Sequence, residues 1–247
     1  MSYFFAENNL IENRKVIIAG NEAHHLLHAR RIRVGETIKL QGPDGKRFTA
    51  LVTDADRRTV TVRTDKEIRV PREPHIHIHL FQAYTKEKTV DVILQKSTEL
   101  GVEEIHFFQS KNSPQQLSSP KMERIRRWES IVIESAKQCD RAVWPKLDII
   151  EGEEQLESRI SMMNHFYIVD AKGKKSLSHM VSEIPRLLGL SIGICIGPEG
   201  GLSETELDFF SRSSNAVMTH LGQRTLRAST AAPVATSIIQ SILGDMQ

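Results

Sequence analysis

The chain has 247 residues, and its 33 Lys and Arg side chains nearly balance 31 Asp and Glu side chains, for a formal charge of +2. Its 39% hydrophobic and 26% charged residues are typical of a globular protein and exclude a wholly disordered chain. No apolar run approaches the roughly 20 residues of a membrane-spanning helix, and residues 1–10 lack the pattern of a signal peptide. Only Cys139 and Cys195 occur, without CxxC spacing, which disfavours a disulfide scaffold. We expect a soluble, cytoplasmic protein.

Positive charge is concentrated in the first third of the chain. Residues 1–73 hold 14 Lys and Arg against 10 Asp and Glu, whereas residues 74–247 hold 19 against 21. Part of the excess is the group Arg30, Arg31 and Arg33. A small basic module beside a near-neutral one favours a polyanionic partner such as RNA, and an ordinary solvated surface is the alternative.

Residues 1–72 predict a small β-barrel made of short strands. Asn21 is expected to cap a short helix over 22–31, and Gly42-Pro-Asp-Gly45 is strong turn chemistry. The segment 70–74 has two prolines and charges, which is typical of a linker. The strands are expected over 15–19, 37–40, 47–52 and 59–63.

Residues 73–247 predict an α/β domain, because strands alternate with helices. Such alternation implies a mostly parallel sheet with helices on both of its faces. Strands are expected over 75–80, 104–108, 166–169, 190–196 and 216–220. Helices are expected over 89–100, 120–141 and 230–243, with another opened by the capping box Ser203-Glu-Thr-Glu206.

Two segments between these elements carry the chemistry. The first, Ile196-Gly-Pro-Glu-Gly-Gly-Leu-Ser203, joins a buried strand to a helix, where ligands bind in open α/β sheets. It matches neither GxGxxG nor the P-loop, which disfavours a nicotinamide dehydrogenase. The second, Leu221-Gly-Gln-Arg-Thr-Leu-Arg227, leads to Ser229 or Thr230 as a helix N-cap that could hold an anion. Arg224 and Arg227 are suited to clamp phosphates or to pair with Glu199. Taken alone, each segment also fits a structural turn.

The two segments together resemble the RsmE family of 16S ribosomal RNA (uracil-N3)-methyltransferases, in the SPOUT superfamily. Three more stretches are similar to family segments: His24-His-Leu26 with Arg31 and Gly35-Glu36, Gln95-Lys-Ser-Thr-Glu-Leu-Gly-Val102, and Glu134-Ser-Ala-Lys-Gln138 with Arg141 and Pro145. The resemblance spans nearly the whole chain, and five ordered segments are far more specific than any one of them.

The resemblance implies a SPOUT-type α/β fold, with a trefoil-knotted, mostly parallel sheet at residues 73–247 and a PUA-like RNA-binding β-barrel at residues 1–72. It also implies a homodimer that binds S-adenosylmethionine and acts on small-subunit ribosomal RNA or an assembled small subunit. The implied cofactor-binding residues are Ile196, Gly197, Pro198, Glu199, Gly200, Gly201, Leu221, Gly222, Leu226, Arg227, Thr230 and Ala231. The residues expected to contact RNA are Arg31, Arg33, Lys86, Lys88, Lys96, Gln138 and Arg141.

The reaction itself places demands on the site. Uridine N3 carries a proton, so the site must remove it or stabilise the anion that develops over N3, O2 and O4. The predicted catalytic residues are Arg227, which we favour for stabilising the anion, Arg224 and Glu199. A general base is left open among Glu199, His220 and solvent.

One departure from the family pattern keeps other functions open. The family has Thr-Glu-Thr-Ala where this chain has Ala228-Ser-Thr-Ala231, so an acidic residue is missing at Ser229. This favours, as an alternative, a catalytically impaired RNA-binding assembly factor. A SPOUT enzyme acting on tRNA and a nucleotide-binding enzyme are further alternatives.

No metal site is expected. His24 and His25 are adjacent on a helix and point in different directions. His75, His77 and His79 share one face of a predicted strand, as a metal-binding comb would require, but an exposed strand face is the expectation.

Overall fold

The computed structural model describes residues 3–117 and 122–246. By compactness the chain divides into two units, one of residues 1–72 with 136–143 and one of residues 73–135 with 144–247. The sequence placed 136–143 in the second domain. Within residues 3–117 and 122–246, no helix is long and apolar enough to cross a membrane.

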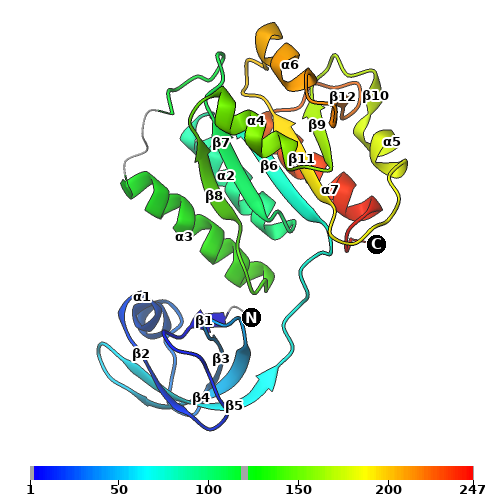
Figure 1. Ribbon diagram of the computed structural model, residues 1–247. Helices are drawn as coiled ribbons and strands as arrows, with labels where there is room; N and C mark the ends of the chain where they lie inside the picture. The colour runs from blue at the N-terminus through cyan, green and yellow to red at the C-terminus, as the bar shows by residue number, and fades with distance from the viewer. Residues whose placement is uncertain (1–2, 118–121, 247) are drawn as a thin grey trace. The chain divides into compact units, whose positions relative to one another are not determined.

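The first unit is built on a five-stranded sheet with the order β1-β3-β4-β5-β2 (Figure 1). All neighbouring strands are antiparallel except β1 and β3. Register shifts along the β4–β5 pair bend the sheet around its own apolar core. The elements are β1 (Tyr3–Phe5), β2 (Lys15–Ile18), α1 (Gly20–His24), the π-helical turn η1 (His25–Ala29), β3 (Thr37–Gln41), β4 (Arg47–Ala55) and β5 (Val60–Ile68).

The expected helix over 22–31 differs from the observed one. It starts at Gly20, and its N-cap is Ala19, with no side-chain hydrogen bond, so Asn21 is not the cap. After His24 the backbone widens into the π-helical turn, which ends when the amide of Arg30 donates to the carbonyl oxygen of His25. The strand β1 was not predicted, since three residues are too few to show a period.

The segment 136–143 joins the first unit through polar contacts. The Tyr3 hydroxyl donates to the carbonyl oxygen of Arg141 at 2.6 Å, and the Gln41 amide donates to that of Ala142 at 2.8 Å. The fully buried Arg47 contacts the Asp140 carboxylate and lies over the Tyr3 ring, 3.8 Å from its centroid. Because these partners are distant in sequence, the linear pattern gave no sign of them.

The second unit is a seven-stranded, fully parallel sheet among the residues described, with the order β10-β12-β9-β11-β6-β7-β8. This confirms the predicted parallel α/β sheet. The late strand β11 lies between the earlier strands β6 and β9. The strands are β6 (His77–Ala83), β7 (Glu104–Phe108), β8 (Lys146–Ile150), β9 (His165–Val169), β10 (Lys175–Ser176), β11 (Ser191–Ile196) and β12 (Ala216–His220).

Helices cover both faces of this sheet (Figure 1). One core unites strand side chains with α2, α3, α5 and α7, and a second core, on the other face, unites them with α4 and α6. The helices are α2 (Glu87–Glu99), α3 (Met122–Cys139), α4 (Glu153–Ser161), α5 (Leu177–Ser182), α6 (Glu204–Ser211) and α7 (Ala228–Ile242). Pro120, expected in the first turn of α3, lies outside the described residues.

Sequence reasoning missed β8, α4, β10 and α5. Lys146–Ile150 has apolar residues at both of its last positions, and so lacks the clean alternation of a half-exposed strand. The helix α5 has only six residues, and the strand β10 only two. The strand β6 starts at His77, two residues later than expected, because the pairing with β11 begins there.

Candidate active site

Three loops meet at the carboxyl edge of the parallel sheet. Residues 197–203 join β11 to α6, and residues 221–227 join β12 to α7. The strand β9 lies between β11 and β12, so the loop that follows it, residues 170–174, is at the same edge. Ligands of open α/β sheets bind at such an edge. The sequence indicated the first two loops but not the third.

The loop 197–203 is held closely on both sides. Gly201 has a φ of +71°, and its amide donates to the carbonyl oxygen of Pro198 at 2.9 Å. A Cβ at Gly197 would lie 3.1 Å from the Leu202 nitrogen. The Asn112 side-chain amide donates to the carbonyl oxygen of Gly201 at 3.1 Å. Gly201 is therefore favoured by the turn, and Gly197 by the close approach of the Leu202 backbone.

The capping box predicted at the start of α6 is confirmed. The Ser203 amide donates to Glu206 Oε2 at 2.7 Å, and the Glu206 amide donates to Ser203 Oγ at 3.4 Å. The Lys111 amide also donates to Glu206, at 3.0 Å. Burial raises the pKa of Glu206, but these hydrogen bonds outweigh it and lower the pKa. The charged carboxylate thus fixes the loop to α6 and to the segment after β7.

Glu199 does not pair with Arg227, contrary to one of the roles considered for it. Its carboxylate accepts hydrogen bonds from the buried Thr85 hydroxyl and, at 3.4 Å, from the Thr89 hydroxyl. Thr85 lies between β6 and α2, and Thr89 lies in the first turn of α2. Glu199 is thereby fixed to the segment that follows β6.

The loop 221–227 is open by comparison. Gly222 has a φ of +117°, and its amide donates to His220 Nδ1 at 3.1 Å. With Nδ1 accepting, a neutral His220 carries its proton on Nε2 and has no lone pair left for a general base. Arg224 and Arg227 are exposed, and neither has an ion-pair partner within residues 3–117 and 122–246.

The helix after this loop begins two residues earlier than expected. Its N-cap is Arg227, with extended backbone and no side-chain cap, so neither Ser229 nor Thr230 is the cap. The Arg227 carbonyl accepts from the amides of Thr230 and Ala231, both at 2.8 Å. The first turn is therefore satisfied by backbone, and the Arg227 side chain remains free to extend from the helix start.

Two residues at this edge were missed by sequence reasoning. A Cβ at Gly173 would lie 2.4 Å from the Thr219 carbonyl carbon, so only glycine fits against the backbone of β12. Gln82 is fully buried, and its amide donates to the carbonyl oxygens of Ala83 at 2.8 Å and Ile196 at 3.4 Å. Its Oε1 has no hydrogen-bond partner in the part of the chain that the structure describes. The Asp-x-x-Gly spacing that ends at Gly173 was the available signal for the first; nothing in the sequence singles out Gln82.

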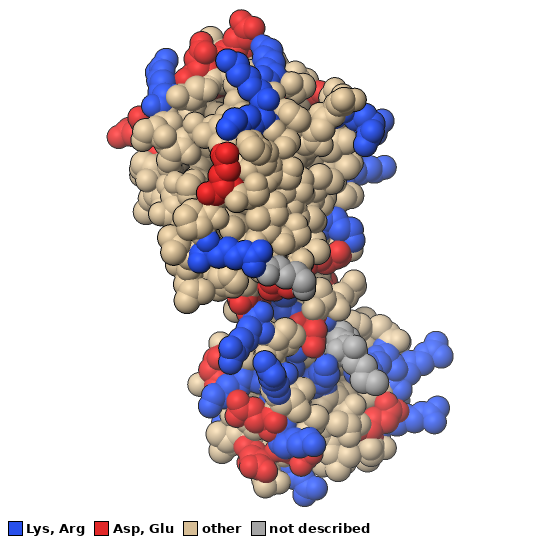
Figure 2. Space-filling view, turned by 90° about the vertical axis from the view of Figure 1, so that its right-hand side faces the viewer, with Lys and Arg blue, Asp and Glu red and all other residues tan. Residues whose placement is uncertain are grey.

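The residues expected to contact RNA divide into two groups. Arg141 is buried, and Lys96 is paired with Glu99 at 2.8 Å. Figure 2 shows Lys and Arg side chains over the N-terminal unit, interspersed with acidic ones. The others are exposed: Arg31, Arg33, Lys86, Lys88 and Gln138. This second group therefore offers its side chains to a ligand.

Two of the three arginines of α3 form ion pairs with α2. Arg127 pairs with Asp91 at 2.6 Å and with Glu87 at 2.8 Å, and Arg124 pairs with Glu87 at 3.0 Å. The Tyr84 hydroxyl also contacts Glu87, and burial together with this carboxylate raises the pKa of Tyr84 to about 12. These contacts tie α3 to α2 near the end of β6.

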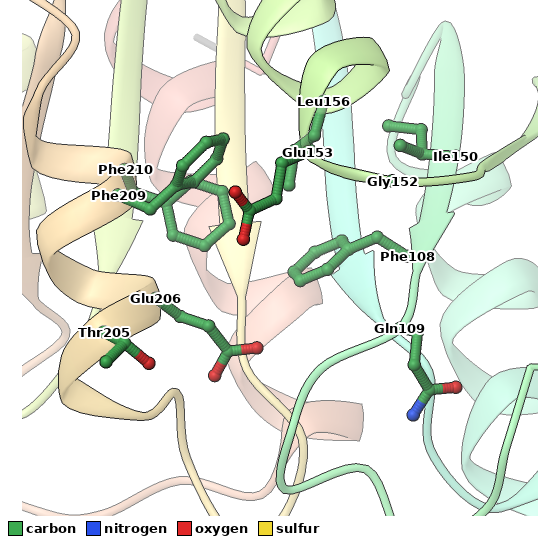
Figure 3. Close-up of a pocket in the computed structure, with 10 residues that line it drawn as sticks. All are labelled: Phe108, Gln109, Ile150, Gly152, Glu153, Leu156, Thr205, Glu206, Phe209 and Phe210. Atoms are coloured by element: carbon green, nitrogen blue, oxygen red, sulfur yellow. The ribbon is translucent and has the colours of Figure 1, made fainter.

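A pocket of about 200 Å³ lies between the carboxyl ends of β7 and β8 and the helices α4 and α6 (Figure 3). Aromatic rings and two carboxylates line it. None of the predicted cofactor-binding residues does. The lining residues are Phe108, Gln109, Ile150, Gly152, Glu153, Leu156, Thr205, Glu206, Phe209 and Phe210.

Comparison with known proteins shows the class of protein to which the chain belongs. Residues 71–240 match the family model of the RNA methyltransferase domain, and residues 18–65 match that of the RNA methyltransferase PUA domain. The chain is therefore an RNA methyltransferase family member with a PUA domain. The predicted SPOUT-type α/β fold with a PUA-like N-terminal domain is confirmed.

Individual relatives identify the family of the chain more closely. Ribosomal RNA small subunit methyltransferase E of Mesomycoplasma hyopneumoniae is 31% identical over 167 residues, 68% of this chain and 70% of that protein. The Bacillus subtilis enzyme of the same name is 29% identical over 90% of this chain and 88% of its own. The crystal structure of the Neisseria gonorrhoeae enzyme, bound to S-adenosyl methionine, is 28% identical, covers 100% of both chains and has a TM-score of 0.85. The chain belongs to this family, ribosomal RNA small subunit methyltransferase E.

Proposed function

We propose that this protein transfers a methyl group from S-adenosylmethionine to N3 of a uridine in small-subunit ribosomal RNA. The observation that supports it most is the pair of loops after β11 and β12, in a chain of this family. One loop is fixed and rich in glycine, and the other presents Arg224 and Arg227 unpaired. Such an edge suits a small ligand held by backbone next to an anionic group.

The residues present fit the cofactor. A Cβ at Gly197 would lie 3.1 Å from the Leu202 nitrogen, and one at Gly200 would lie 3.1 Å from the Asn112 side chain, so the loop that would hold the cofactor is closely packed at both positions. Among the described residues the buried Gln82 Oε1 has no hydrogen-bond partner, and Gln82 is paired in register with Ile196, the residue before the same loop. We assign cofactor binding to 196–201, to Leu221, Gly222 and Leu226, and to the start of α7 at 227–231. When bound, S-adenosylmethionine supplies an electrophilic methyl group on sulfur.

Arg227 is the residue to which we assign stabilisation of the uracil anion. Its guanidinium is always charged, and its donors match two oxygens or an oxygen and a nitrogen of a planar imide. Arg224 lies in the same loop and is a second donor to the RNA. Glu199 is held by two hydroxyls, which suits a positioning role better than proton transfer. The N3 proton then leaves to solvent.

The N-terminal domain, residues 1–72, is assigned to RNA binding through Arg31 and Arg33, and the domain 73–247 to catalysis. Lys86, Lys88 and Gln138 complete the proposed RNA contacts, whereas the buried Arg141 and the paired Lys96 are better explained as structural. We also propose that the protein acts on ribosomal RNA in the cytoplasm, as a homodimer. Sedimentation of the purified chain tests the dimer.

The test is methyl transfer from labelled S-adenosylmethionine to small subunits, and separately to tRNA, both from cells lacking this protein. N3-methyluridine in the ribosomal RNA, detected by mass spectrometry and lost with Arg227→Ala, is the expected result. Methyl transfer to tRNA but not to small subunits would show that tRNA is the substrate. Cofactor binding without transfer to either RNA would contradict the proposal.

That last outcome would identify the second candidate, an RNA-binding assembly factor. The observation that favours it is Ser229, which stands on the first turn of α7 where the family pattern has an acidic residue. Restoring a carboxylate with Ser229→Glu separates the two candidates, since only an impaired enzyme would gain activity from it.

A further inference from the structure

Two neighbouring strands bring two imidazoles and a carboxylate together, away from the proposed active site. His79 lies on β6 opposite Glu104 of β7, and His106 follows two residues later on the same face of β7. His79 Nδ1 is 3.4 Å from His106 Nε2 and 3.6 Å from Glu104 Oε2, and the last two atoms are 3.5 Å apart. The three ligand atoms thus form a nearly equilateral triangle.

This triangle has the dimensions of one face of a zinc tetrahedron. An ion with bonds of about 2.0–2.1 Å holds its ligand atoms about 3.3–3.4 Å apart. The observed separations exceed this by at most a few tenths of an ångström. We propose that His79, Glu104 and His106 bind one divalent ion of the zinc class, with a fourth position for water.

Hydrogen bonding alone leaves this cluster poorly satisfied. His106 Nδ1 is 3.1 Å from the Asp148 carboxylate and so carries the ring proton, which leaves a lone pair on Nε2. Glu104 Oε2 is also an acceptor. His79 Nδ1 has at most one hydrogen to offer both, and at 3.6 Å its contact with Glu104 is too long for a hydrogen bond. A cation would satisfy all three atoms at once.

The surroundings orient the ligands as those of metal sites do. Asp148, which fixes the His106 ring, is itself held by Arg159 at 3.1 Å, and the outer oxygen of Glu104 is held by Lys146 at 3.2 Å. Such outer carboxylates set the tautomer of a ligating histidine.

The ion would be structural. His79 lies four residues before the end of β6, about 13 Å along the strand from the carboxyl edge that bears the loops. His106 is fully buried, beside Phe81 in the core beneath α4 and α6. Zinc would therefore fasten β6 to β7 without entering the methyl-transfer step, and it would stabilise the folded chain by binding it selectively.

The test titrates Zn²⁺ into the chelator-treated full chain by calorimetry, with Co²⁺ absorption to read the geometry. We expect one ion per chain, a tetrahedral Co²⁺ spectrum and a Tm that rises with Zn²⁺. His79→Gln and Glu104→Gln should each weaken binding at least tenfold. His77→Gln is the matched control: it lies on the same strand and face, contacts Glu103, and should leave binding unchanged.

Asp148→Asn tests the site without removing a ligand. It should weaken zinc binding by about tenfold or more, because the His106 ring loses its orienting carboxylate. It also tests the proposed zinc site if His79→Gln or Glu104→Gln fails to fold. Undiminished binding in His79→Gln, Glu104→Gln or Asp148→Asn would overturn the proposal by placing the ion elsewhere. The absence of stoichiometric binding by the native chain would leave a hydrogen-bonded cluster only.

Discussion

The loops after β11 and β12 leave the same edge of one sheet, yet they differ in how they are held. The first, residues 197–203, is fixed by Asn112, by the capping box and by the threonines that bind Glu199. The second, residues 221–227, is held at its two ends, by the bond from the Gly222 amide to His220 and by the Arg227 carbonyl, which accepts from the first turn of α7, and it carries two exposed arginines.

This difference indicates a distinct role for each loop. A loop whose backbone is already fixed loses little conformational entropy when it binds a small ligand. A loop with exposed guanidinium groups offers them to an anionic partner. We therefore expect substitutions in the first loop to affect mainly stability and cofactor affinity, and those in the second mainly turnover.

The largest expected effect tests the second loop. Arg227→Ala should lower kcat by about 10²–10³-fold, as loss of one donor to a developing anion does elsewhere. Cofactor affinity, measured by calorimetry, should change much less. Arg224→Ala is the matched control, with a loss below about tenfold. Equal losses from both variants would show that the loop acts only through its total charge.

The next effect concerns the loop after β9, residues 170–174, where it packs against β12. Gly173→Ala should destabilise the fold by about 1–3 kcal/mol, because the new methyl group overlaps the backbone of Thr219 and must displace it. Urea unfolding measures this. Gly200→Ala, whose Cβ would meet only the Asn112 side chain at 3.1 Å, should cost less. A larger cost for Gly200→Ala would mean that the first loop tolerates an added methyl group less well than the loop after β9.

A smaller effect compares the two helix starts. Ser203→Ala should cost about 1 kcal/mol by removing the cap of α6, whereas Ser229→Ala, which caps nothing, should cost less than about 0.5 kcal/mol. The contribution of Glu206 to this cap is present above the usual Glu pKa of about 4.3. It is lost as the pH falls through the lowered pKa of the folded state. A cost for Ser203→Ala that persisted unchanged at pH 2 would contradict this account.

The smallest expected effect is a gain. Ser229→Glu places a carboxylate in the first turn of α7, where it interacts favourably with the helix dipole by about 0.3–1 kcal/mol. Thermal unfolding should show a slight rise in Tm, with methyl transfer within about twofold of the native rate. A large rise in activity would instead favour the impaired-factor alternative.

Much of the fold was accessible from local pattern. The capping box, the linker near residue 72 and the glycine at 101 that ends α2 are set by neighbours along the chain. The helix start at Ala228 was missed because Ser and Thr are preferred N-cap residues, so Ser229 and Thr230 were favoured over Arg227. The strand β8 was missed because its pattern gains meaning only beside β7.

The sequence by itself determined the class of protein: an α/β methyltransferase domain after a small β-rich module, with its chemistry in two loops. Those features depend on periodicity, turn residues and ordered motifs, which are local. Tertiary structure alone decided that Glu199 faces Thr85 and Thr89, that Gly173 abuts Thr219, and that His79 meets His106 rather than His77. Each of these pairings depends on strand order and register, which place residues far apart in the chain within a few ångströms.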